Sequence, residues 1–89
     1  MNFIHEEERI YLENEKGWLM AELVFPVTDG VADITTTFVH RLMRGQGVSG
    51  KLMREAVAVF RAKNLKVRTT CSYAAEWFQK HPEEQDLLA

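Results

Sequence analysis

Residues 43–51 read MRGQGVSGK, and three phosphate-binding patterns overlap in this stretch. Residues 45–50 fit G-x-G-x-x-G, the dinucleotide fingerprint, and residues 45–51 fit most of a Walker A loop, G-x4-G-K. Residues 44–49 fit a third pattern, R-x-x-G-x-S, in which a cation precedes small residues that let an anion approach the backbone. The sequence on either side of the stretch decides between these patterns.

The whole chain has the composition of a globular protein. It has 89 residues, of which 46% are hydrophobic and 27% charged, so we expect one domain spanning residues 1–89. No apolar run approaches the roughly 18 residues of a membrane span. The acidic start MNFIHEEER is unlike a signal peptide, so we expect a cytoplasmic protein without a membrane partner. A single cysteine, Cys71, excludes an internal disulfide and a Cys-rich metal site, and we expect no metal.

The charges divide unevenly along the chain. Residues 1–30 carry seven acids and two bases, whereas residues 31–70 carry two acids and eight bases. The basic part can be a set of solvated faces, or a surface that meets a polyanion. Three of its bases lie in or beside the glycine stretch, which favours a small phosphorylated ligand. We expect no nucleic-acid partner, because the chain has neither an RNA-binding aromatic platform nor a helix-turn-helix.

Three strands are predicted before the glycine stretch. Residues 9–13 alternate apolar and polar side chains, and residues 18–25 follow them after the turn sequence NEKG. Pro26 ends the second strand, since proline cannot donate to a ladder. Residues 31–39 are rich in β-branched side chains and predict a third strand. The three strands are expected to form an antiparallel meander.

After the glycine stretch the periodicity changes to that of a helix. Apolar residues at helical spacing predict a helix over 47–63, with Asn64 as its C-cap. A fourth strand is predicted over 65–72, a second helix over 73–81 and a short final turn over 83–89. The order is therefore βββ-α-β-α, an α+β fold with an α/β-type core. The strands at 31–39 and 65–72 are expected to be parallel, joined by a right-handed crossover.

Two of the three phosphate patterns do not fit this context. A Walker A loop needs Ser or Thr after its lysine, and residue 52 is Leu. In the dinucleotide fold the first glycine follows its strand directly, whereas five residues separate Val39 from Gly45. The third pattern fits: amides at a helix start can cradle a pyrophosphate, with Arg44 at the edge. A glycine-rich helix start that binds no ligand is the alternative.

The chain resembles a group of small, single-domain proteins in the GCN5-related N-acetyltransferase (GNAT) superfamily. The resemblance rests on TFVHRLMRGQGVSGKLMREAVAVFRAKNLKV, on CSY after the last core strand, and on the tail HPE…DLL, which occur together at the expected spacing. It implies a reduced GNAT fold that binds acetyl-CoA or coenzyme A but lacks the outer elements that form an acceptor site in larger members. It also implies an amine acceptor, either a small molecule or a peptide. We expect a monomer or a weak homodimer.

The resemblance implies a set of cofactor-binding residues at the end of the third strand and in the following loop. They are Phe38, Val39, Arg44, Gly45, Gln46, Gly47, Val48, Ser49 and Gly50. The chain departs from the group in two places. Ser49 stands where Gly or Ala is usual, and Thr36 and Thr37 stand where His-Thr is frequent, so a general base cannot be carried over to this strand.

Two residues are candidates for catalysis. Cys71 can be a buried small hydrophobe, or a thiol beside the acetyl thioester, whose pKa the nearby cation Arg68 would lower. Tyr73 matches the tyrosine that protonates the departing thiolate in larger GNATs, or it packs like other half-buried tyrosines. For the general base, His40, Glu22 and Asp33 remain candidates, and nothing in the sequence selects one.

Three functions follow from these observations. The leading hypothesis is an acyltransferase that transfers an acetyl group from acetyl-CoA to an amine. The alternative is a non-catalytic coenzyme A-binding or regulatory module, and a third possibility is an interaction domain without a cofactor.

Overall fold

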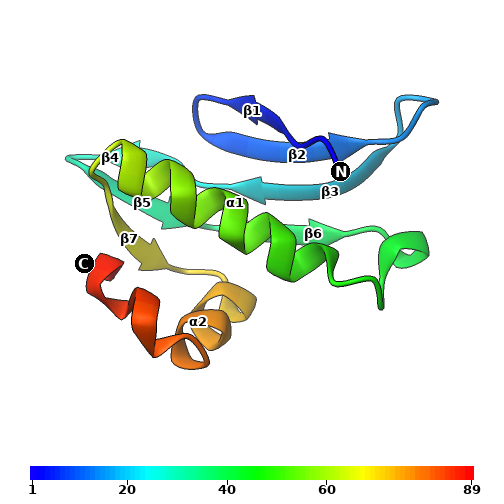
Figure 1. Cartoon of the computed structure of the whole chain (residues 1–89). Coiled ribbons are helices and arrows are strands. Elements are labelled where there is room, and N and C mark those ends of the chain that lie inside the picture. The colour runs from blue at the N-terminus through cyan, green and yellow to red at the C-terminus, as the bar shows by residue number, and fades with distance from the viewer.

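The computed structural model describes residues 1–89 and has the α+β architecture expected from the sequence (Figure 1). None of its helices is long and apolar enough to cross a membrane. Its strands are β1 (Ile4–Glu6), β2 (Arg9–Glu13), β3 (Leu19–Val24), β4 (Val27–Thr28), β5 (Val31–Ile34), β6 (Thr36–Val39) and β7 (Lys66–Thr69). Its helices are α1 (Val48–Ala62) and α2 (Ser72–Gln79), with short 3₁₀ segments η1 (Arg41–Met43) and η2 (Pro82–Leu87).

The predicted hairpin of the first two strands is confirmed as β2 and β3. The Asn14 side chain closes its turn by accepting the backbone N–H groups of Lys16 and Trp18, each at 2.9 Å. Gly17 has a φ of +81°, a conformation that residues with a Cβ rarely adopt. Strand β3 ends before Pro26, as expected. The sequence did not predict β1, which pairs antiparallel with β2, or the short β4.

The predicted strand over 31–39 is divided at Thr35, and this is the main correction to the predicted fold. Its first half, β5, pairs in parallel with β7, whereas its second half, β6, pairs antiparallel with β3. Thr35 and Thr36 both lie opposite Val24, and the Thr35 N–H donates to the Val24 carbonyl at 3.0 Å. This extra residue is a β-bulge, which turns the strand out of its first sheet. The parallel pairing with β7 is therefore right for residues 31–34 and wrong for residues 36–39.

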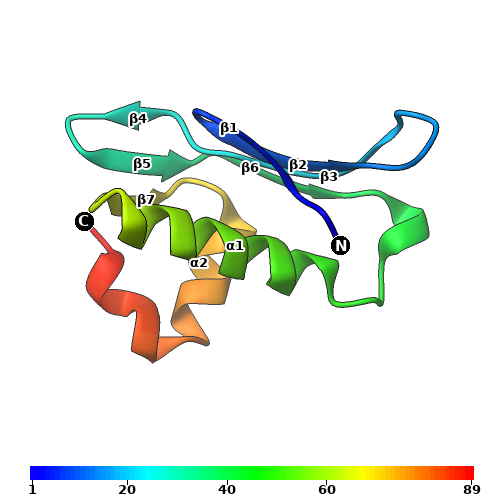
Figure 2. The same ribbon diagram turned by 45° about the horizontal axis from the view of Figure 1, so that its top comes forward.

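Two sheets result, one in the order β1-β2-β3-β6 and one in the order β4-β5-β7. Beyond the bulge, β6 and β7 diverge, and the edge of β6 is left without a neighbouring strand. Both helices lie on one side of the sheets, and their other side is bare (Figure 2).

Helix α1 begins and ends within one residue of the predicted limits, 47 and 63. Its buried residues recur at helical spacing and face the sheet: Val48, Leu52, Met53, Ala56, Val57 and Phe60. The Phe60 ring meets Phe25 edge to face at 5.0 Å, in the middle of the core. The C-cap of α1 is Lys63 rather than the predicted Asn64; Asn64 follows it with a φ of +55°, in the left-handed conformation that commonly comes directly after a helix.

The C-terminal elements are shorter than predicted. Strand β7 ends at Thr69 rather than at residue 72, because Cys71 already occupies the N-cap position of α2. Helix α2 ends at Gln79, and the predicted final turn is the 3₁₀ segment η2. The chain end returns to the sheet, where the Ala89 N–H donates to the Val67 carbonyl at 2.9 Å.

Candidate functional site

The loop between β6 and α1 contains a run of backbone N–H groups without acceptors. Gly45 and Gly47 have φ values of +80° and +72°, and Gly47 is the N-cap of α1. The N–H of Arg44 donates to Arg41 and that of Lys51 to Gly47, but no N–H of residues 45–50 has a partner in the protein. Backbone N–H groups of folded proteins normally have an acceptor, which can belong to the protein, to water or to a ligand. The first N–H groups of a helix also carry a partial positive charge. Six consecutive free donors therefore suit an anion.

A cleft of about 280 Å³ opens beside this loop, where β6 and β7 diverge. Its floor and walls come from β6, α1 and α2, and it brings together five of the predicted site residues. Its lining residues are Thr37, Phe38, Val39, Arg44, Ser49, Leu52, Met53 and Tyr73. The cleft is mostly apolar, and its polar lining includes the cationic Arg44 and Ser49, one of the residues with a free N–H. That is the composition of a small-molecule site, in which few polar groups fix the orientation of the ligand.

The other predicted loop residues do not line the cleft, and their side chains have different structural roles. The Gln46 side chain donates to the Leu42 carbonyl at 3.2 Å and holds the loop closed. The Val48 side chain is buried in the core, and its N–H is one of the free donors. Gly47 and Gly50 line a second hollow of about 540 Å³, which continues along α1 past Lys51.

The free edge of β6 offers a further donor to the cleft. The His40 N–H donates to Met20 of β3 at 2.7 Å. Because N–H groups along a strand alternate in direction, the Phe38 N–H also faces β3, and those of Thr37 and Val39 face away from it. The Thr37 N–H is directed at the Cys71 sulfur. The Val39 N–H is thus the donor that the strand presents to the cleft.

Cys71 lies behind the cleft, half-buried at the start of α2. Its sulfur is 3.2 Å from the Thr37 hydroxyl. Burial raises the pKa of the Cys71 thiol, but the Thr37 hydroxyl and the backbone N–H groups of Ala74, Tyr73 and Thr37 outweigh burial and lower it. The net direction is a pKa below the ordinary value, which favours the thiolate.

The expected role of Arg68 is wrong. Arg68 pairs in register with Asp33 on β5 and lines a separate hollow with it, and it has no part in the pKa shift of Cys71. Hydrogen bonds, not a cation, lower the pKa of the thiol. Neighbourhood in the sequence misled here, because β7 ends at Thr69 and the chain has turned into α2 by Cys71, whereas Arg68 stays beside Asp33 on the sheet.

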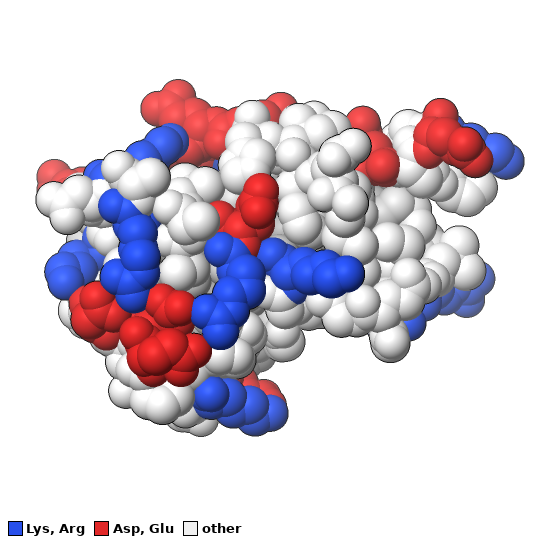
Figure 3. All heavy atoms as spheres, in the orientation of Figure 1, with Lys and Arg blue, Asp and Glu red and all other residues white.

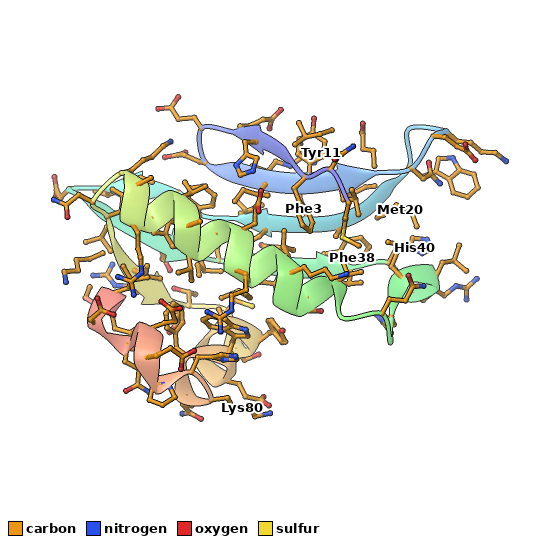
Figure 4. All side chains as sticks on the ribbon, viewed as in Figure 1. Phe3, Tyr11, Met20, Phe38, His40 and Lys80 are labelled. Carbon is orange, nitrogen blue, oxygen red and sulfur yellow. The ribbon has the colours of Figure 1, made fainter.

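None of the three candidate bases lines the cleft. The ring of His40 accepts the Leu42 N–H at 3.1 Å and caps η1; Figure 4 shows it at the end of β6. Glu22 is paired with Arg9 on β2, and Asp33 accepts the Thr70 hydroxyl at 2.7 Å. No group of three or more His, Cys, Asp or Glu side chains is arranged to hold a metal ion.

The sequence did not single out Thr37, Leu52 or Met53 as site residues. Leu52 and Met53 belong to the apolar stripe of α1, and such a stripe does not tell which of its members also line a cleft. Thr37 acts through Cys71, which is 34 residues away in sequence, so only the fold brings the two together.

Comparison with known proteins agrees with this geometry. The sequence matches the family of GCN5-related N-acetyltransferases over residues 9–87. No protein of curated function matches it. The structure is similar to the NMR solution structure of a GCN5-like candidate N-acetyltransferase from Staphylococcus aureus, with 28% identity and a TM-score of 0.82, over 99% of this chain and 87% of that one.

The fold also extends to a larger protein. The crystal structure of Tetrahymena GCN5 has a TM-score of 0.67 at 15% identity, over 84% of this chain and 51% of that one. The larger protein therefore contains this fold within a longer chain. With the family match spanning nearly all of its residues, the chain belongs to the GCN5-related N-acetyltransferase family, a family of acetyltransferases.

Proposed function

We propose that the protein transfers the acetyl group of acetyl-CoA to an amine, with the cofactor bound in the cleft beside α1. The observation that carries the proposal is the run of six free N–H groups at residues 45–50, which borders the apolar cleft at Ser49 and the adjoining hollow at Gly47 and Gly50. The loop suits an anion that is large enough to bind several of these amides. The cleft suits an apolar chain attached to that anion. Coenzyme A has this form, with a pyrophosphate followed by the pantetheine arm.

The residues present fit such a ligand. The amides of the loop would bind the pyrophosphate, and Arg44 stands at the same end of the cleft. The apolar walls from β6 and α1, with Leu52 and Met53, would cover the arm. At Gly45, Gly47 and Gly50 there is no side chain, and no other atom lies within 4 Å of the position that a Cβ would take. A ligand can therefore approach the backbone closely there. Lys51, in the adjoining hollow, is a further cation on the path along α1.

Bound acetyl-CoA would supply an activated acetyl group as a thioester. The Val39 N–H would then donate to the acetyl carbonyl oxygen, a position that favours the negative charge developing there during acyl transfer. The Tyr73 hydroxyl, on the opposite wall, would give its proton to the departing thiolate. The apolar walls would exclude water and so limit hydrolysis of the thioester.

Cys71 is the nucleophile that the chain itself brings nearest to this end of the cleft. The hydroxyl of Thr37, a residue of the cleft wall, forms a hydrogen bond with the Cys71 sulfur. The lowered pKa of the thiol increases its thiolate fraction at neutral pH. We propose that Cys71 affects the acetyl end of the ligand through Thr37, which lines the cleft and contacts the sulfur. A lone free thiol also agrees with the cytoplasmic location that we propose for the protein.

Two measurements on the same preparation test the proposal. Thermal unfolding is followed with coenzyme A, acetyl-CoA, NAD and ATP side by side, and we expect the midpoint to rise with the first two and not with NAD. Release of free thiol from acetyl-CoA is then followed with a panel of amines and peptides, with Cys71→Ala and Tyr73→Phe as variants. Absence of binding would refute the cofactor assignment. Binding without turnover by any acceptor would instead support a coenzyme A-binding module.

A further inference from the structure

The bare side of the β1-β2-β3-β6 sheet carries one row of side chains that crosses all four strands. Ile4 lies opposite Tyr11, Tyr11 opposite Glu22, and Glu22 opposite Phe38. Residues directly opposite each other on antiparallel strands share a face. The partners of these residues on the other face, such as Ile10 and Leu23, are fully buried against the helices, so this row points away from them. Figure 2 shows that no helix covers it, and Figure 4 shows Tyr11 on the side of β2 away from α1.

The row already binds one cation, the guanidinium group of Arg9. The guanidinium of Arg9 lies 3.9 Å above the centre of the Tyr11 ring, and its Nε donates to the Glu22 carboxylate. A carboxylate beside an aromatic face is a favourable place for a guanidinium or an ammonium group. Arg9 has a second partner, Glu6, at 3.3 Å. It can therefore leave Glu22 and remain paired.

The row ends at the cleft. Phe38 is its last member, and the same residue lines the cleft beside Val39. On the helix side the cleft is lined by side chains of α1 and α2, among them Met53 and Tyr73, and the proposed cofactor fills this side. A second substrate that approaches the edge of β6 without displacing the cofactor must therefore come over the bare side of the sheet, past Phe38 and Glu22.

The shape and charge of this side restrict what can lie on it. None of the cavities in the structure includes Arg9, Tyr11 or Glu22, so the surface is flat, whereas small molecules bind in concave sites. Two carboxylates, Glu6 and Glu22, surround the single cation Arg9 on this face, whereas Arg44 and Lys51 make the cofactor side basic. A flat, acidic sheet face that leads to the cleft suits an extended, basic polypeptide.

We propose that the bare face of the β1-β2-β3-β6 sheet is the acceptor-binding surface, and that Glu22 and Tyr11 take a basic side chain of an extended peptide in place of Arg9. The inference rests on the proposed function, because it names the acceptor of the same cleft. Glu22 and Tyr11 here bind and position the acceptor rather than act on the thioester. Arg9 is then an internal competitor for the acceptor's cation.

The competition gives two substitutions with opposite expected effects. Glu22→Gln removes the charge that receives the cation, so it should weaken the binding of a basic peptide by about five- to tenfold. Arg9→Gln removes the competitor, so it should strengthen the binding several-fold. An ion pair with a purely structural role would not produce opposite changes, since both substitutions break the same pair.

The test is an NMR titration of the ¹⁵N-labelled protein with the peptide Lys-Ala-Lys-Ala-Lys, with and without coenzyme A, and with Glu-Ala-Glu-Ala-Glu as the control. We expect the amide signals of Tyr11, Glu22 and Phe38 to shift with the basic peptide only, with the order of affinity Arg9→Gln, wild type, Glu22→Gln. Lys16→Gln, which removes a cation from the hairpin turn instead, should leave the affinity unchanged.

The outcomes separate this inference from the proposed function. Suppose that coenzyme A binds at residues 45–50 but the bare face does not respond to the peptide, or that all variants bind the peptide equally. Either result refutes the acceptor surface and leaves the proposed function standing. A response to a small amine such as putrescine equal to that of the peptide refutes the choice of a polypeptide. If coenzyme A itself leaves residues 45–50 unchanged, the proposed function fails and the acceptor assignment fails with it.

Discussion

Gly47 and Gly50 lie three residues apart at the start of α1, and they differ in what they require of the backbone. Gly47 has a φ of +72°, which L-residues adopt at a cost of about 1–2 kcal/mol. Gly50 lies within the helix, where glycine is less favourable than alanine by roughly 0.5–1 kcal/mol. Neither residue has an atom within 4 Å of the position that a Cβ would occupy. Space alone therefore does not require either glycine.

The two glycines give a matched pair of substitutions. We predict that Gly47→Ala lowers the free energy of unfolding by about 1–2 kcal/mol, because alanine is strained at that φ. Gly50→Ala should raise it by roughly 0.5–1 kcal/mol, and yet weaken coenzyme A binding, since its methyl group would lie where the pyrophosphate approaches the amides. Denaturant unfolding of the free protein and calorimetric titration measure the two effects. Gly50→Ala with unchanged affinity would argue against the close approach.

The hydroxyl of Thr37 is the main group that favours the thiolate of Cys71, and it too can be tested at the residue level. The pKa of the thiol is lowered, so its alkylation by iodoacetamide should rise with pH through a midpoint below that of the same thiol in the unfolded chain. Thr37→Val keeps the shape and removes the donor. Its midpoint should therefore move to higher pH, because the thiolate loses stabilisation while burial still opposes it.

The control is Thr70→Val, which removes the hydroxyl paired with Asp33 and should not change the midpoint. Equal alkylation profiles for wild type and Thr37→Val would show that the hydroxyl does not stabilise the thiolate.

The conformation of the glycine loop follows from the sequence, whereas the surroundings of Cys71 do not. The glycines, Arg44 and Ser49 are consecutive, so their pattern predicts a helix start with free amides, and the structure has one. The neighbours of Cys71 depend on which strands pair. Arg68 is three residues away along the chain but points to another face, and Thr37 is distant in sequence but in contact.

Among the elements, the divided strand 31–39 matters most for the site. An unbroken strand would pair with β7 along its whole length and leave no cleft. The run of β-branched residues VADITTTFV predicts extended structure well, but it contains no signal for the bulge at Thr35. A β-bulge bends the strand locally, but a bulge without glycine leaves no mark in the sequence, because its position is decided by which strands pair in the tertiary structure.

The segment η2 is held to α1 by ion pairs, and this attachment is also testable. Arg61 binds Glu84 and Asp86, and Arg54 binds Glu83 and Glu84; Figure 3 shows acidic and basic side chains interleaved at this end of the molecule. The hydrogen bond from Arg61 is the main cause that lowers the pKa of Asp86. A carboxylate with a lowered pKa stabilises the fold above its ordinary pKa, near 3.8, and the contribution is lost as pH falls through the folded-state value.

We therefore predict that the Asp86 carboxyl titrates below 3.8 in the folded protein, and that Arg61→Gln moves its midpoint up toward that value. Carbon-detected NMR of the side-chain carboxyls measures this directly. Lys80→Gln removes the pair with Glu76 on α2 and should leave the Asp86 titration unchanged. An Asp86 midpoint that does not respond to Arg61→Gln would refute the ion pair as the cause.

At the scale of the whole molecule, the two helices and the sheets share one core, and Phe60 lies at its centre against Phe25. Phe60→Ala should lower the free energy of unfolding by about 3–5 kcal/mol, a large share of the stability of a domain this small. Phe60→Leu, which keeps most of the volume, should cost clearly less. Equal losses for the two variants, measured by denaturant unfolding, would show that the cavity is not the cause.

The acidic and basic segments of the sequence lie on different surfaces of the folded molecule. The acidic N-terminal strands form the bare side of the sheet, and the basic stretch 31–70 contributes Arg44 and Lys51 beside the loop of free amides. Composition predicts the imbalance, but only the fold shows that the acidic strands form the bare face, next to a cleft whose own lining comes from residues 37–73. This arrangement supports an anionic cofactor on one side and a cationic acceptor on the other.

The central claim, that the amides of residues 45–50 bind the pyrophosphate of coenzyme A, is tested most directly by an NMR titration of the ¹⁵N-labelled protein with coenzyme A, with NAD as the comparison. We predict that coenzyme A shifts the amide signals of Gly45, Gly47 and Gly50 and their neighbours in the loop, together with Val39 of the cleft, and that NAD leaves them in place. Signals in this loop that remain unchanged at saturating coenzyme A, or that shift equally with NAD, would contradict it.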